Sequence, residues 1–184
     1  MNVYISGGAK SGKSEIGEKL AVKMAKEQNL PIYYVATMIP KDKEDEKRIE
    51  NHRKSRAHKG FETLELKIPK DFKKFSGESD EIHSGAIEGV FLFDSVTAFL
   101  ENVIFDEEYN VDPEAWQKVT ETLLAFLQEK KNVIFISDFI FSDGVTYPEE
   151  TEIFRKNLAN CDRILAKACD HLWEVSAGQI IEYK

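Results

Sequence analysis

A glycine-rich motif near the N-terminus constrains the fold of this chain more than any other sequence feature. Gly7-Gly8-Ala9-Lys10-Ser11-Gly12-Lys13-Ser14 has the spacing G-x-x-x-x-G-K-[ST], and it lies between an apolar run at residues 3–5 and a helical pattern at residues 16–24. In such a P-loop the backbone N–H groups converge on phosphate oxygens, and the following helix adds its positive N-terminal end. The sequence therefore predicts a nucleotide site formed by all eight residues. The alternative is a glycine-rich turn with an exposed lysine.

Three side chains in this prediction carry the chemistry. Lys13 would reach the β and γ phosphates, and the Ser14 hydroxyl would contribute to binding Mg²⁺. Asp94 ends an apolar run over residues 89–93 and is placed to hold the same ion, directly or through water. On spacing alone, capping of the helix that follows explains Asp94 equally well.

The order of the expected elements indicates the fold class. Strands expected at residues 31–37, 61–66, 89–94 and 133–137 alternate with helices expected at 40–59, 113–130 and 149–169. Residues 69–86 predict a loop or a weak helix, and two short β runs around Ser176-Ala177-Gly178 predict a closing hairpin. We therefore expect one domain over residues 1–184, an α/β P-loop NTPase of the RecA-like class. Its sheet would be mainly parallel, flanked by helices, with a C-terminal β-hairpin.

Charge and composition exclude several classes of partner. A formal net charge of -8 argues against non-specific binding to nucleic acid or to an anionic membrane, because the long-range field repels polyanions. No segment has the apolar length of a membrane span, and no targeting signal is visible, so we expect a cytoplasmic protein. Cys161 and Cys169 do not have the spacing of a metal site or of a disulfide framework.

A charged segment after the second expected strand contains a candidate nucleophile. Arg48, His52 and Arg56 are four residues apart and would share one helix face, which gives a local basic stripe suited to the phosphates of a nucleotide. A neutral imidazole among these cations could attack an α-phosphate. An ordinary solvated helix face accounts for the same pattern.

Several of these motifs occur in an order that resembles a known family, the bifunctional adenosylcobinamide kinase/adenosylcobinamide-phosphate guanylyltransferases. The similarity covers nearly the whole chain, and the His52 segment is its most specific part. The matching motifs are the loop from Gly7 to Ser14, Tyr34-Val35-Ala36-Thr37, Arg48-Ile49-x-x-His52-Arg53-x-x-Arg56, Thr63-x-Glu65, Asp94, Phe154-Arg155 and Leu172-Trp173-x-Val175.

The resemblance implies a two-step enzyme of cobalamin biosynthesis. The family phosphorylates the aminopropanol hydroxyl of adenosylcobinamide, a corrinoid, and then transfers GMP from GTP to that phosphate. Carried over, His52 bears the guanylyl group covalently, and the P-loop with Lys13 holds the triphosphate. Ser14 and Asp94 would bind Mg²⁺. The expected substrates are GTP and, as a second candidate, ATP. The family resemblance further implies a homotrimer, and guanine-nucleotide contacts from Thr37, Arg53, Arg56 and Glu65.

The chain departs from the family pattern over residues 137–148. An Asn-Glu-Val-Gly run leading to Gly-Ile-Val-Pro is expected there, whereas the sequence is Ser137-Asp138-Phe139 followed by Ile140 to Pro148. Ala57 replaces a common proline, and Ser95-Val96-Thr97 replaces a threonine-rich run. Two alternatives therefore stay open: a P-loop kinase for another small hydroxylated metabolite, in which His52 is a surface residue, and a nucleotide-sensing protein without turnover.

Overall fold

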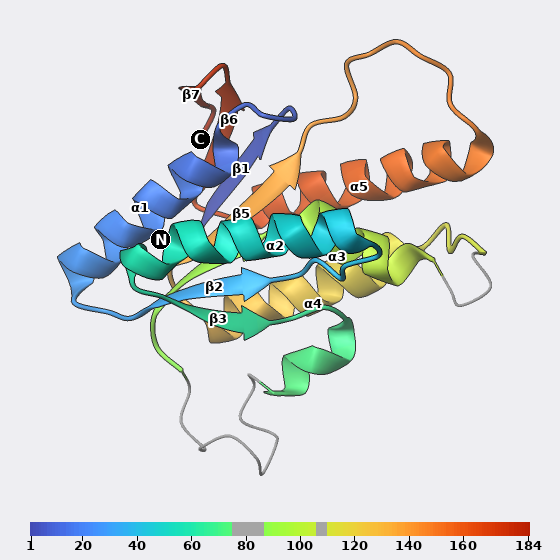
Figure 1. Ribbon diagram of the computed structural model, residues 1–184. Coiled ribbons are helices and arrows are strands. Elements are labelled where there is room, and N and C mark those ends of the chain that lie inside the picture. Colours follow the sequence, from blue (N-terminus) through green and yellow to red (C-terminus); the bar gives the residue numbers. More distant parts are fainter. Residues whose placement is uncertain (75–86, 106–109) are drawn as a thin grey trace.

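The computed structural model describes residues 1–74, 87–105 and 110–184, except for the side chains at positions 48, 51, 52, 55, 57, 73 and 74. Its centre is a seven-stranded sheet with the order β3-β2-β4-β5-β1-β6-β7 (Figure 1). Neighbouring strands run parallel except β6 and β7, which form an antiparallel hairpin. The strands are β1 (Val3–Gly7), β2 (Ile32–Ala36), β3 (Phe61–Glu65), β4 (Val90–Asp94), β5 (Val133–Asp138), β6 (His171–Ser176) and β7 (Gln179–Glu182).

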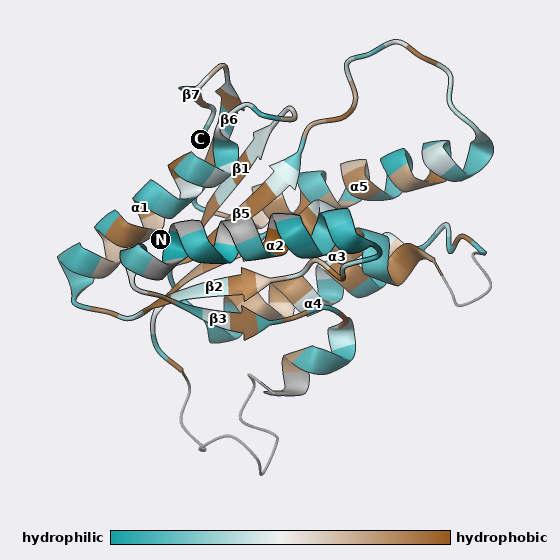
Figure 2. Cartoon of the chain, viewed as in Figure 1, coloured by the Kyte–Doolittle hydropathy of each residue, from teal (hydrophilic) through white to brown (hydrophobic). Residues whose placement is uncertain are grey.

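Helices cover both faces of this sheet. The helix α1 (Lys13–Gln28) packs on one face, and α3 (Val96–Ile104), α4 (Ala115–Glu129) and α5 (Glu149–Ala168) pack together on the other. A further helix, α2 (Lys43–Arg56), continues into the short 3₁₀ segment η1 (Ala57–Lys59), and η2 (Pro69–Lys74) follows β3. The helix α2 has few apolar residues, whereas the central strands are strongly apolar (Figure 2).

The apolar run of β4 is explained by burial on both of its faces. Phe91 and Phe93 pack into the cluster formed with α3, α4 and α5, whereas Val90 and Leu92 pack into the cluster formed with α1. A parallel strand covered on both sides reads as a continuous hydrophobic stretch because alternate side chains enter two different cores. Such a strand can carry a polar residue only at its end, where Asp94 lies.

The fold class predicted from the sequence is confirmed, including the mainly parallel sheet and the C-terminal hairpin. The expected charged helix at residues 40–59 corresponds to α2 and η1, and every expected strand is present. The helix α3 was not predicted as an element of its own. Of the segment 69–86, the first part forms η2, and residues 75–86 lie outside the described part of the chain. Among the described helices, none is both long and apolar enough for a membrane span.

Candidate functional site

The predicted P-loop joins the end of β1 to the start of α1. Gly12 has a φ of 94°, a left-handed conformation that a side chain would strain, and α1 begins at the next residue. A Cβ at Gly7 would lie 2.6 Å from the Val175 carbonyl oxygen and 2.6 Å from Ser11 Oγ, so this position has no room for one. The two glycines of the motif are thus required by backbone conformation and by close approach, respectively.

The Lys13 side chain is held inside this loop by two contacts. Its Nζ lies 2.6 Å from Asp138 Oδ1 and donates a hydrogen bond of 3.3 Å to the Gly8 carbonyl oxygen. The buried Ser11 Oγ has no hydrogen-bond partner in the described structure. A buried hydroxyl without a partner is costly, so the loop carries polar capacity that a phosphate oxygen could satisfy.

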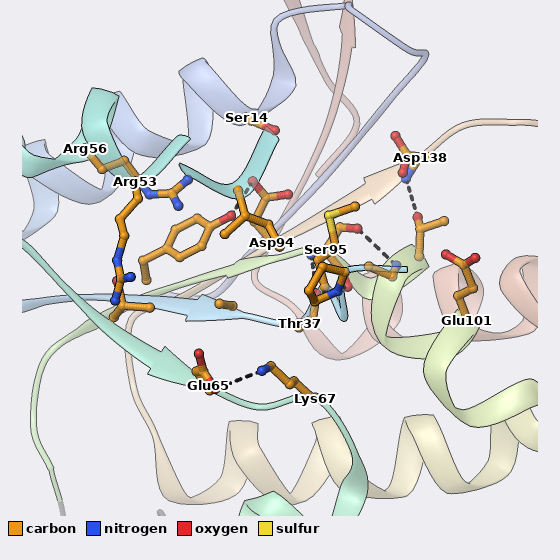
Figure 3. A pocket seen from close by; sticks show the side chains of 18 residues that line it. Ser14, Thr37, Arg53, Arg56, Glu65, Lys67, Asp94, Ser95, Glu101 and Asp138 are labelled. Carbon is orange, nitrogen blue, oxygen red and sulfur yellow. Dashed lines mark hydrogen bonds and ion pairs between the residues drawn. The ribbon is translucent and has the colours of Figure 1, made fainter. Parts of the chain in front are cut away.

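A cavity of about 370 Å³ opens beside the loop at the carboxyl ends of β2, β4 and β5 (Figure 3). Ligands of open α/β sheets bind at this edge of the sheet. The cavity is lined by residues of both charge signs, some from the loop and its neighbouring strands and some from α2, β3 and α3. They are Ser14, Tyr34, Ala36, Thr37, Met38, Pro40, Ile49, Arg53, Arg56, Thr63, Glu65, Lys67, Asp94, Ser95, Thr97, Ala98, Glu101 and Asp138.

Six of the candidate site residues meet in this cavity. Ser14, Thr37, Arg53, Arg56, Glu65 and Asp94 all line it, although they come from five different parts of the chain. The other loop residues, Gly7 to Lys13, do not line the cavity, and Lys13 is connected to it through Asp138. His52 belongs to α2, and its side chain lies outside the described part of the structure.

Arg56 and Tyr34 form a buried wall of the cavity. The Arg56 guanidinium carbon lies 3.4 Å from the centre of the Tyr34 ring, and the Tyr34 hydroxyl donates a hydrogen bond of 3.2 Å to Asp94 Oδ2. Burial raises the pKa of Tyr34, and the Asp94 carboxylate raises it further, so the phenol stays protonated and keeps donating. Arg56 is 6 % exposed, and its Nη1 has no hydrogen-bond partner among the described atoms. It is therefore a desolvated cation suited to an anionic ligand.

Asp94 is not the cap of the helix that follows it. The Ser95 side chain accepts the hydrogen bond from the Ala98 N–H at the start of α3, at 3.2 Å. Thr37 fixes the same corner, because its Oγ1 accepts from the Ser95 N–H at 2.8 Å and donates to the Ser95 carbonyl oxygen at 3.0 Å. Ser14 and Asp94 thus both present oxygen atoms at one cavity, which is the ligand type that Mg²⁺ prefers.

Two acidic residues of this region were missed in the sequence analysis. Asp138 ends the buried strand β5 just as Asp94 ends β4, so the reasoning applied to Asp94 would have found it. Glu18, on the buried face of α1, lies 3.9 Å from Arg56 Nη1 and also accepts a hydrogen bond from Lys59. No sequence signal indicated Glu18, since an acid on an amphipathic helix is normally exposed.

The loop, the sheet order and the cavity define a P-loop nucleotide-binding protein of the RecA-like class. In particular, β5 lies between the P-loop strand β1 and the strand β4 that carries Asp94. The ATPase domain of G40P is similar in fold, with a TM-score of 0.53 and 12 % identity over 94 % of this chain and 68 % of that one. A KaiC-like protein from Pyrococcus horikoshii OT3 gives a TM-score of 0.49, with 14 % identity over 100 % of this chain and 78 % of that one.

Sequence comparison narrows the class to one family. The family model described as cobinamide kinase / cobinamide phosphate guanyltransferase matches residues 3–183, and the chain belongs to this family. The bifunctional adenosylcobalamin biosynthesis protein CobU of Escherichia coli (strain K12) is 25 % identical over 195 residues, covering 100 % of both chains. The protein is accordingly an enzyme of the kinase and nucleotidyltransferase class.

Proposed function

We propose that this enzyme phosphorylates the aminopropanol hydroxyl of adenosylcobinamide and then transfers GMP from GTP to the new phosphate. The observation that carries the proposal is the shared cavity, where Ser14 of the P-loop meets Arg53, Arg56 and Glu65. Phosphates need the loop and the cations, whereas a carboxylate such as Glu65 can accept hydrogen bonds from a purine edge. Family membership supplies the corrinoid acceptor and the order of the two steps.

Within this proposal each P-loop group has a defined task. Lys13 leaves Asp138 and contacts the β and γ phosphates, while backbone N–H groups of the loop bind phosphate oxygens. Ser14 and Asp94 would hold Mg²⁺, and the ion would supply positive charge that offsets the phosphates of GTP or ATP. Thr37 and Arg53 contribute to the wall that faces the guanine nucleotide. The buried Arg56 offers to an anion its Nη1, which contacts Glu18 at 3.9 Å and has no hydrogen-bond partner among the described atoms.

His52 is proposed as the nucleophile of the guanylyl step. It precedes Arg53 on α2, and Arg53 lines the cavity. In this step a lone pair of the imidazole forms a bond to the α-phosphorus of GTP, and pyrophosphate leaves. The acceptor phosphate then displaces the histidine and takes GMP. A homotrimer is proposed on the family resemblance, and the exposed Ile180 and Ile181 of β7, each 47 % accessible, are apolar side chains that a subunit interface could cover.

Covalent labelling tests the guanylyl step directly. The purified protein is incubated with Mg²⁺ and α-labelled GTP, then denatured and measured by intact mass beside His52→Asn and the matched control His58→Asn. His58 is exposed in η1 and has no assigned role. We expect acid-labile GMP on the wild type and on His58→Asn, and none on His52→Asn. A label that survives His52→Asn, or a wild type that takes up none, would contradict the covalent histidine.

A further inference from the structure

Asp138 occupies a position between the two phosphate-handling strands. It is the last residue of β5, which lies between β1 and β4, and it pairs in register with Gly7 of the P-loop. Its carboxylate contacts Lys13 Nζ at 2.6 Å, its side chain is 33 % exposed, and it lines the cavity. Asp138 therefore contacts the P-loop lysine and also lines the cavity that an acceptor substrate would enter.

The backbone holds this carboxylate in a fixed place. The Asp138 N–H donates to Thr97 Oγ1 at 2.9 Å, and the next N–H, of Phe139, donates to the Gly7 carbonyl oxygen at 2.9 Å. One bond ties the residue to α3 and the other ties it to the P-loop. Such preorganisation is a requirement for a group that acts on a reacting atom, because a displacement of about 1 Å can cost roughly 100-fold in rate.

Other carboxylates around the cavity have different contacts. Asp94 Oδ2 accepts the Tyr34 hydroxyl, Glu65 pairs with Lys67 at 2.9 Å, and Glu101 pairs with Lys41 at 2.5 Å. Figure 3 shows Glu101 and Asp138 on the side of the cavity opposite Arg53 and Arg56. The arginine side suits the nucleotide, which leaves the Asp138 side for the acceptor.

We propose that Asp138 is the general base of the kinase step, an inference that rests on the proposed kinase activity. When phosphates draw Lys13 away, the carboxylate is released and can accept a hydrogen bond from the acceptor hydroxyl. The acceptor hydroxyl oxygen forms a bond to that phosphorus as its proton passes to Asp138. The bond from phosphorus to the β,γ-bridging oxygen breaks, and the electron pair leaves with the nucleoside diphosphate.

The test compares Asp138→Asn with the wild type in single-turnover transfer from γ-labelled ATP or GTP to adenosylcobinamide. The amide keeps the shape of the side chain and cannot take the proton. We expect the transfer rate to fall about 100-fold or more. The Kd for the nucleotide should stay equal or decrease, because a negative charge near the phosphates is removed. Covalent GMP labelling should persist, and Glu121→Gln, an exposed acid on α4, should behave as the wild type.

Three outcomes would overturn the inference. A wild-type transfer rate in Asp138→Asn, with tighter nucleotide binding, would make Asp138 only a counter-ion of Lys13. A slow variant restored by high Mg²⁺ would make it a metal-binding group instead. A wild type that binds nucleotide and transfers no phosphate would contradict the kinase part of the proposed function. It would also contradict the role of Asp138 as general base. A slow variant that Mg²⁺ does not restore, with intact binding and labelling, supports the inference.

Discussion

At the scale of single residues, polar groups lie where the buried strands end. Asp94 and Asp138 close β4 and β5, and a third acid, Asp162 of α5, lies behind them. The Tyr4 hydroxyl donates to Asp162 Oδ1, and Ser137 Oγ donates to the same oxygen at 2.8 Å. These two hydrogen bonds connect the end of β5 to β1 and α5.

Asp162 makes the stability of the fold depend on pH. Burial, the largest cause, and the nearby Asp138 raise the pKa of Asp162 from 3.8 to about 6, against the lowering effect of the hydrogen bonds from Tyr4 and Ser137. An acid whose pKa is higher in the folded state binds more protons when folded, so its contribution to stability falls as pH rises from about 4 to 6. The full difference corresponds to about 3 kcal/mol.

Asp162→Asn should remove this dependence while it keeps an oxygen that accepts both hydroxyl hydrogen bonds. We expect the free energy of unfolding of the wild type to fall relative to the variant between pH 4 and pH 7, by about 2 to 3 kcal/mol. Urea titrations at a series of pH values measure it. A difference between the two proteins that stays constant over this range would show that Asp162 is not protonated in the fold.

At the scale of elements, α2 is held in place by charge. Of its described side chains Arg56 is the buried one, and Glu18 of α1 contacts it while also accepting a hydrogen bond from Lys59 of η1. A helix without an apolar face has little hydrophobic attachment to the sheet. The position of His52 and Arg53 thus depends on an ion cluster at the end of their helix.

Glu18→Gln should loosen α2 without unfolding the sheet. The change leaves Arg56 buried without its counter-ion, which we expect to destabilise the attachment of residues 43–59 by about 2 kcal/mol. Hydrogen exchange should be faster in that segment and unchanged in β4 and β5. The matched control is Glu27→Gln, because Glu27 is an exposed acid on α1, the helix that also carries Glu18. Equal protection of α2 in all three proteins would rule out this anchoring.

Sequence reasoning found the elements whose pattern is local. Hydrophobic periodicity, together with the glycine and proline residues that mark element ends, indicated the P-loop, the apolar strands and the amphipathic helices α4 and α5. The fold class was therefore predictable. A helix after Asp94 was considered in the sequence analysis, but α3 was given no bounds there, because only Ser95 separates this apolar helix from the apolar strand β4. The contacts of Glu18 with Arg56 and of Asp138 with Lys13 join residues far apart in the chain, which no spacing rule reveals.

At the scale of the whole molecule, the molar mass in solution tests the proposed trimer. Light scattering on the protein eluting from a size-exclusion column should give three times the mass of one chain. The edge strand β7 keeps Ile180 and Ile181 exposed, so replacing both by lysine on this edge should disfavour any association through it. A single-chain mass at micromolar concentration would contradict the trimer, and an unchanged trimer in the lysine variant would place the interface elsewhere.

Conversion of adenosylcobinamide by the purified protein tests the central claim most directly. The protein is incubated with the corrinoid, ATP, GTP and Mg²⁺, and the corrinoid products are followed by mass spectrometry. We predict that the wild type forms the phosphate first and its guanylylated product second. We expect Lys13→Ala to form both at least about 100-fold more slowly, because its charge is missing from the transition state. A folded wild type that binds nucleotide and leaves the corrinoid unchanged would contradict the account.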